Sequence, residues 1–208
     1  MILRITEQLD VPLRERNQLL LAGGYAPAYP MRSFDEPELA SVRAALRKVL
    51  AGHDPYPAVV VNRYWEMLDA NSAVSLLISD VASSLLEPPV NVLRLTLHPD
   101  GLAPRITNLA EWRARLLGQL ERRVLATNDP RLAALLEELR SYPGEDGPAP
   151  SATSVVLPMK VLVDGVELSF FSIAASVETA YDVTVEELVI ESFYPADAHT
   201  AEVLRARG

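Results

Sequence analysis

The side chains that most often carry out catalysis or bind metals are few in this sequence and lie far apart. There are three histidines, His53, His98 and His199, and no cysteine. No histidine stands at a ligand spacing from another histidine or a carboxylate, which argues against a metal site. A G-x-S-x-G nucleophile turn and a glycine-rich phosphate loop are also missing. We therefore expect a protein that is not an enzyme and that uses no cofactor.

One arginine lies among apolar residues. Arg94 lies within the run Val92-Leu93-Arg94-Leu95-Thr96-Leu97, where a charged side chain must reach a partner, an anion or water. It could pair with a carboxylate or a carbonyl of the fold, or it could bind the acidic head group of a ligand. A guanidinium can meet a carboxylate through two parallel hydrogen bonds, so Arg94 is our first candidate for ligand binding.

Two other polar residues are weaker candidates. His98 begins the turn His98-Pro99-Asp100-Gly101, which it could cap, and Asn71 could cap a short helix. Either side chain could instead contact a ligand. Trp65 and Trp112 are large enough to stack on a ligand, although tryptophans in apolar patterns are more typical of a protein core.

The pattern of apolar residues predicts the elements that position these candidates. Residues 57–61 are rich in β-branched residues, and Asn62-Arg63 can turn the chain into a second strand around Trp65 and Leu68. A short apolar helix from residue 72 and two longer helices, which begin at Asn108 and at Asp129-Pro130, follow. These features predict two early strands followed by a helical middle.

The last part of the chain is strand-like. We predict strands over residues 154–163, 166–177 and 188–194, with a tight turn at Asp164-Gly165, a final helical turn over 200–205, and a loop over 142–153. The whole pattern predicts an α+β fold, in which a five-stranded antiparallel sheet has helices packed on one face. Alternation and helical periodicity predict that its interior includes Val59, Val61, Leu68, Leu116, Leu120, Leu162, Leu168, Phe170, Ile190 and Phe193.

The beginning of the chain reads as a separate piece. Residues 1–30 contain two short helices, the second ended by Gly23-Gly24, and the linker that follows them. Two such helices bury little by themselves, so we expect them to be the end of a larger helical unit. The predicted domains are therefore residues 1–30 and residues 31–208.

Composition limits the functions that this chain can have. The 208 residues are 49% hydrophobic and carry a net charge of −9. A DNA-binding face needs clustered positive charge, so we expect no specific DNA binding by these residues alone. No stretch approaches the roughly 20 apolar residues that span a bilayer, and no signal peptide is evident, so we expect a cytoplasmic protein without a membrane partner.

Several runs of residues are distinctive in their order and spacing. They are Arg16-Asn17 through Leu21 to Gly24-Tyr25-Ala26-Pro27, Pro57-Ala58-Val59-Val60-Val61-Asn62-Arg63-Tyr64-Trp65 with Asn71, Asn91-Val92-Leu93-Arg94-Leu95-Thr96-Leu97-His98-Pro99-Asp100-Gly101-Leu102, Leu168-Ser169-Phe170-Phe171, Asp182-Val183-Thr184, and Glu191-Ser192-Phe193-Tyr194-Pro195-Ala196-Asp197 with Thr200-Ala201. In these runs the chain resembles, over nearly its whole length, the MmyB-like transcription regulators of the Xre-type helix-turn-helix family.

The resemblance implies a PAS-like ligand-binding domain preceded by the last helices of a helix-turn-helix domain. Contact with DNA would then be made only by helices that precede this sequence, in a regulator that acts as a homodimer if its DNA site is two-fold symmetric. The implied ligand is an apolar, acidic, fatty-acid-like molecule held between the sheet and the helical middle. We expect Arg94 to bind its head group and Trp65, Leu116, Phe170 and Phe193 to line the pocket, with His98 and Asn71 nearby. The alternative is a dimerisation domain that holds no ligand.

Overall fold

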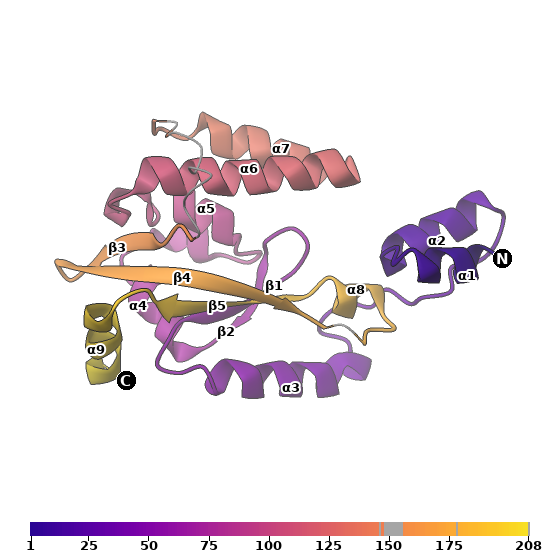
Figure 1. The fold of residues 1–208 in the computed structure, drawn as a ribbon, viewed down its shortest axis with the longest axis horizontal. Coiled ribbons are helices and arrows are strands. Elements are labelled where there is room, and N and C mark those ends of the chain that lie inside the picture. Colours follow the sequence, from indigo (N-terminus) through magenta and orange to yellow (C-terminus); the bar gives the residue numbers. More distant parts are fainter. Residues whose placement is uncertain (146, 148–155, 178, 208) are drawn as a thin grey trace.

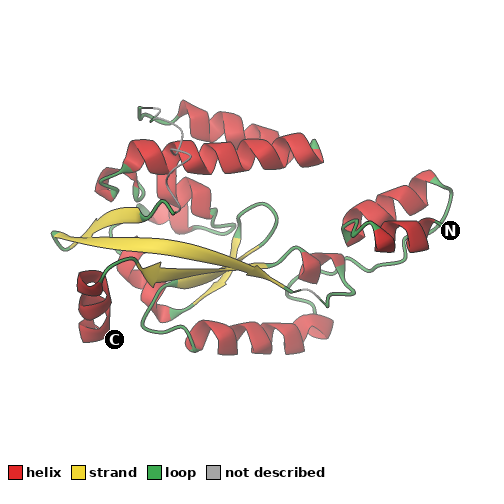
Figure 2. Ribbon diagram, viewed as in Figure 1, coloured by secondary structure: helices red, strands yellow, loops and turns green. Residues whose placement is uncertain are grey.

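In the described part of the chain, the central element is a five-stranded antiparallel sheet with the strand order β2-β1-β5-β4-β3 (Figures 1 and 2). The computed structural model describes residues 1–145, 147, 156–177 and 179–207. The strands are β1 (Ala58–Val61), β2 (Met67–Ala70), β3 (Met159–Val163), β4 (Val166–Ser176) and β5 (Val189–Pro195). The first strand, β1, pairs with the last, β5, so the two early and three late strands form one sheet. The predicted α+β, PAS-like sheet is confirmed.

Helices occupy the beginning, the middle and the end of the chain. The α-helices are α1 (Ile2–Gln8), α2 (Leu13–Ala22), α3 (Ala40–Ala51), α4 (Ser75–Ile78), α5 (Val92–Leu97), α6 (Leu109–Thr127), α7 (Pro130–Ser141), α8 (Val183–Glu186) and α9 (Ala198–Arg207). Among the described residues, no helix is both long enough and apolar enough to cross a membrane. The loop expected over residues 142–153 and the start of the strand expected from residue 154 lie mostly outside the described residues.

β1 is covered on both of its faces, whereas we expected helices on one face of the sheet only. All four of its residues are buried. Val59 faces the helical middle and packs with Val74, while Val60 faces the other way and packs with Leu46 and Leu50 of α3. Successive side chains of a strand point to opposite faces, so a strand that is apolar at every position needs cover on both sides. Helix α3 provides the second cover, across the sheet from α5, α6 and α7 (Figure 1).

The β3–β4 hairpin turns at Asp164-Gly165, as predicted, and both turn residues have positive φ angles, of 51° and 77°. The turn pairs Val163 with Val166, which places Val161 opposite Leu168 on the buried face. Leu162 pairs with Glu167 on the outer face and is 38% exposed, so its predicted place in the interior is wrong. The other strand and helix residues predicted for the interior are buried or half-buried.

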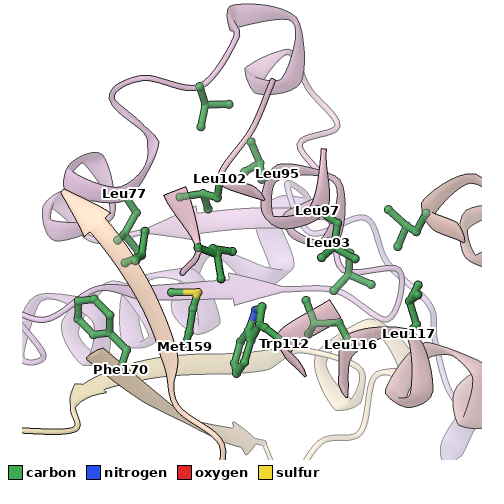
Figure 3. Close-up of a cluster of buried hydrophobic side chains, with 14 of the residues drawn as sticks. Leu77, Leu93, Leu95, Leu97, Leu102, Trp112, Leu116, Leu117, Met159 and Phe170 are labelled. Atoms are coloured by element: carbon green, nitrogen blue, oxygen red, sulfur yellow. The ribbon is translucent and has the colours of Figure 1, made fainter. Parts of the chain in front are cut away.

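The main core lies between the sheet and the helical middle. Leu120 of α6 and Leu132 and Leu139 of α7 are fully buried there, as are Leu168 and Phe170 of β4. The cluster joins α4, α5 and α6 to β3 and β4 (Figure 3). Its members face each other across the space in which a ligand was expected.

The first two helices lie beside α8 at one end of the sheet (Figure 1). The backbone N–H of Leu13 donates to the Glu186 carboxylate at 2.8 Å, and Arg14 donates to both carboxylate oxygens of Glu187, at 2.6 and 2.8 Å. Glu187 also accepts a hydrogen bond from Arg63, in the loop between β1 and β2, at 3.0 Å. These ionic contacts join α2 to the part of the protein that contains the sheet.

Candidate functional site

An apolar cavity of about 70 Å³ lies between the sheet and the helical middle. The sheet forms one wall and helices α4, α5 and α6 form most of the other (Figure 3). Its lining residues are Val59, Trp65, Met67, Val74, Leu77, Ile78, Val92, Leu93, Leu95, Thr96, Leu102, Trp112, Leu116, Gln119, Met159, Glu191 and Phe193.

Three of the predicted site residues line this cavity. They are Trp65, Leu116 and Phe193. Phe170 is not among the lining residues: it is fully buried and packs edge-on against Phe193, with the ring centroids 6.4 Å apart. A role in ligand binding stays a prediction for all four.

Trp65 reaches the cavity from a turn rather than from the strand in which we expected it. Its φ angle is 58°, in the left-handed region, and β2 begins only at Met67. The turn is organised by the side chain of Asn62, whose Oδ1 accepts hydrogen bonds from the backbone N–H groups of Tyr64 and Glu66. An asparagine that bonds to the backbone ahead of it is a common way to shape such a turn.

Arg94 does not line the cavity, which corrects the place that we expected for it. Its Nε and Nη2 donate to the two carboxylate oxygens of Glu138 in α7, at 2.6 and 2.7 Å. The run around Arg94 forms helix α5, in which Leu93 and Leu97, four residues apart, share the buried face. The same helix turns the arginine toward α7, so it pairs with a carboxylate of the fold.

We expect Arg94→Ala to cost less than about 1 kcal/mol at neutral pH, because both partners are more than a third exposed and such pairs contribute little. Hydrogen bonding to Arg94 is the main cause that lowers the pKa of Glu138. The stabilisation is therefore present above the pKa of an unfolded glutamate and is lost as the pH falls through the lowered pKa of the folded state. Urea unfolding at pH 7 and pH 3 should show the difference between wild type and variant shrinking at the lower pH. A selective loss of ligand affinity in this variant would restore Arg94 to the site.

Asn71 and His98 have structural roles and lie outside the cavity lining. The Asn71 side chain accepts from the backbone N–H of Ala58 at 2.9 Å and donates to the carbonyl of Tyr56 at 2.8 Å, so it neither caps a helix nor faces the cavity. His98 Nδ1 accepts from the backbone N–H of Asp100 at 3.0 Å, which caps the turn. The residues expected near the head group are thus not brought together with the apolar ones.

Glu191 of β5 is one of the polar residues in the cavity lining, with Thr96 and Gln119. Burial raises the pKa of its carboxyl, while the nearby Ser172 hydroxyl and the positive charge of Arg115 act in the opposite direction. Glu191 is two residues from Phe193, so alternation along the strand puts both on one face. Because Phe193 is predicted to face the interior, the same alternation predicts an inward-facing carboxylate at Glu191.

The indole nitrogen of Trp112, a residue that we expected in the core, adds a further polar group to the cavity. Trp112 is 3% exposed, and its Nε1 has no hydrogen-bond partner among the described residues. The indole extends from α6 beside Met159, with its nitrogen end toward the interior of the cluster (Figure 3). Arg115 follows Trp112 by three residues in α6, and its guanidinium lies 4.8 Å from the centroid of the Trp112 ring.

An antiparallel sheet that encloses an apolar cavity with a few polar groups under a cover of helices is the architecture of a small-molecule-binding domain. Residues 42–206 match the family model for the MmyB-like transcription regulator ligand binding domain. The chain therefore belongs to this family, which is one of transcription regulators. No curated protein matches the chain.

Proposed function

We propose that this chain is the sensor region of a bacterial DNA-binding transcription regulator and that it binds a predominantly apolar small molecule in the cavity between sheet and helices. The observation that carries the proposal is the lining: most of its side chains are aliphatic, aromatic or methionine, and few are polar. Ligand pockets combine many apolar contacts with a small number of polar groups that fix orientation. Membership of the family agrees with this role.

A fatty-acid-like chain is the ligand that the family resemblance implies, and the apolar lining suits such a chain. The cavity, at about 70 Å³, is smaller than the roughly 300 to 1,000 Å³ of typical ligand pockets. A long ligand would therefore have to displace lining side chains. Met67 and Met159 are suited to this, because unbranched methionine side chains adapt readily to a changed space.

We further propose that occupancy of the cavity is passed to DNA-binding helices that precede the sensor region, with α1 and α2 as the last part of that unit. Trp65 lines the cavity, and Arg63, in the same turn, contacts Glu187, which in turn pairs with Arg14 of α2. A change in the turn would reach α2 through two ionic contacts. Such a regulator would act in the cytoplasm, as a homodimer if its DNA site is two-fold symmetric.

Mass spectrometry of the purified protein under native conditions tests the proposal. We expect an apolar compound to remain bound to the intact chain and to be released on denaturation. A dimer that carries no bound compound would instead favour the alternative of a dimerisation domain.

A variant that fills the cavity provides a second test. Val74→Phe places a larger side chain in the lining, so we expect the affinity for an apolar fluorescent probe, N-phenyl-1-naphthylamine, to fall at least about ten-fold, a change of about 1.4 kcal/mol. Val49→Phe is the matched control, because Val49 is 51% exposed on α3. Equal affinity for the probe in both variants would show that it binds elsewhere.

A further inference from the structure

We propose that Trp112 and Glu191 together bind the polar group of the ligand, and that this group is uncharged, a hydroxyl or a carbonyl, rather than a carboxylate. The inference rests on the proposed function, since it concerns the head group of the same apolar ligand. The cavity is then expected to prefer long-chain alcohols or carbonyl compounds to the corresponding fatty acids.

Trp112 offers a hydrogen-bond donor that the fold leaves unused. Its indole lines the cavity and is buried, yet its Nε1 has no partner in the part of the chain that the structure describes. Nearly all buried polar groups in proteins are paired, so an unpaired one at a cavity wall indicates a missing partner. An oxygen atom of a ligand in the cavity would provide the acceptor.

Glu191 offers a carboxyl group from the opposite, sheet side of the same cavity. The backbone of Glu191 lies opposite Val59 of β1 on one side and Ala174 of β4 on the other, so pairing with both neighbouring strands fixes its position. Burial raises the pKa of this carboxyl, against the opposing effects of the Ser172 hydroxyl and the positive charge of Arg115. The carboxyl can accept a hydrogen bond from a hydroxyl when ionised and can donate one to a carbonyl or hydroxyl when protonated.

A ligand carboxylate would meet unfavourable surroundings. None of the described residues that line the cavity is an arginine, lysine or histidine. Arg94 is held by Glu138, and the guanidinium of Arg115 lies over the ring of Trp112 without being part of the lining. Two carboxyl groups close together cannot both ionise readily, so the acid would have to bind together with a proton. Its affinity should then weaken as the pH rises.

The test compares 1-decanol with decanoate, two compounds with the same chain length, as competitors of N-phenyl-1-naphthylamine on the full chain at pH 8. We expect decanol to bind at least about ten-fold more tightly than decanoate. Glu191→Gln removes the like charge and should shift the affinity ratio toward decanoate. Glu202→Gln, at an exposed position of α9, is the matched control and should leave the ratio at its wild-type value.

Trp112→Phe tests the indole donor. Loss of one hydrogen bond should weaken decanol binding by about three- to ten-fold. The dye has no strong hydrogen-bond acceptor, so the change in its affinity reports only the change in cavity volume. We expect the affinity for decanol to fall by a larger factor than the affinity for the dye. Should this variant fail to give a wild-type circular dichroism spectrum, Glu191→Gln decides alone.

The outcomes separate this inference from the proposed function. Decanoate that binds wild type as tightly as decanol, or a ratio that Glu191→Gln leaves unchanged, would overturn the assignment of an uncharged head group while the cavity remained a binding site. If the dye and both competitors fail to bind, the proposed function fails and the head group assignment fails with it.

Discussion

Replacing Arg63 with methionine is expected to lower the free energy of unfolding by about 3 kcal/mol. The Arg63 side chain is 8% exposed and donates to Glu187 at 3.0 Å and to Asp129 at 3.3 Å. Removal of one partner from a buried ion pair costs roughly 3 to 5 kcal/mol, because the remaining charge is left buried without compensation. We expect the lower end of that range, since Glu187 keeps Arg14 and Asp129 keeps the hydroxyl of Tyr64.

Arg47→Met is the control for this prediction. Arg47 pairs with Asp69 at 3.0 Å, but its side chain is 70% exposed, so the loss should stay below about 1 kcal/mol. Both variants are compared by urea unfolding under the same conditions. If Arg63→Met cost no more than Arg47→Met, the ion pairs of Arg63 with Glu187 and Asp129 would contribute no more to stability than an exposed surface pair.

The strands and most helices could be predicted because their signals are local. A continuous β-branched run marks β1, and Asp164-Gly165 marks the turn of the β3–β4 hairpin, since both residues tolerate the positive φ angles found there. The same turn also predicts the outer position of Leu162. Across a two-residue turn Val163 pairs with Val166, so Leu162 and Leu168 must lie on opposite faces.

The cover of β1 by α3 could not be predicted in the same way. An apolar strand indicates that both faces are buried, but the residues that cover each face come from distant parts of the chain. Amphipathic spacing predicts that α3 packs on something through Leu46 and Leu50, without saying on which side of the sheet. That choice depends on contacts between elements, which a local pattern does not contain.

The composition of the cavity wall follows from the sequence only in part, for a related reason. Periodicity predicts Leu116 and Phe193 for the interior, because apolar faces must meet inside the fold, and both line the cavity. The apolar run around Arg94 leaves two partners open, a carboxylate of the fold or a ligand head group, and helix α5 turns the arginine toward Glu138. Glu191 lies in a mostly apolar strand, and a carboxylate there is as typical of an outward-facing position, so its place at the cavity depends on the strand register.

Leu120→Ala is expected to lower the free energy of unfolding by about 2 to 5 kcal/mol. Leu120 is fully buried in α6 and belongs to the main core cluster. Truncation of a buried leucine loses the transfer free energy of its methyl groups and leaves a cavity that the surroundings fill only partly. Urea unfolding, with an unchanged dependence on denaturant concentration, is the appropriate measurement.

Leu125→Ala makes the same chemical change on the same helix at a side chain that is 79% exposed. Alanine and leucine differ little in helix propensity, so this control should remain within about 0.5 kcal/mol of wild type. Equal losses in the two variants would mean that Leu120 does not contribute to the main core cluster. Leu116, one helical turn earlier, lines the cavity, but Leu120 does not. A stability loss in Leu120→Ala with unchanged affinity for the apolar probe would therefore distinguish the side chains of α6 that hold the fold together from those that bind the ligand.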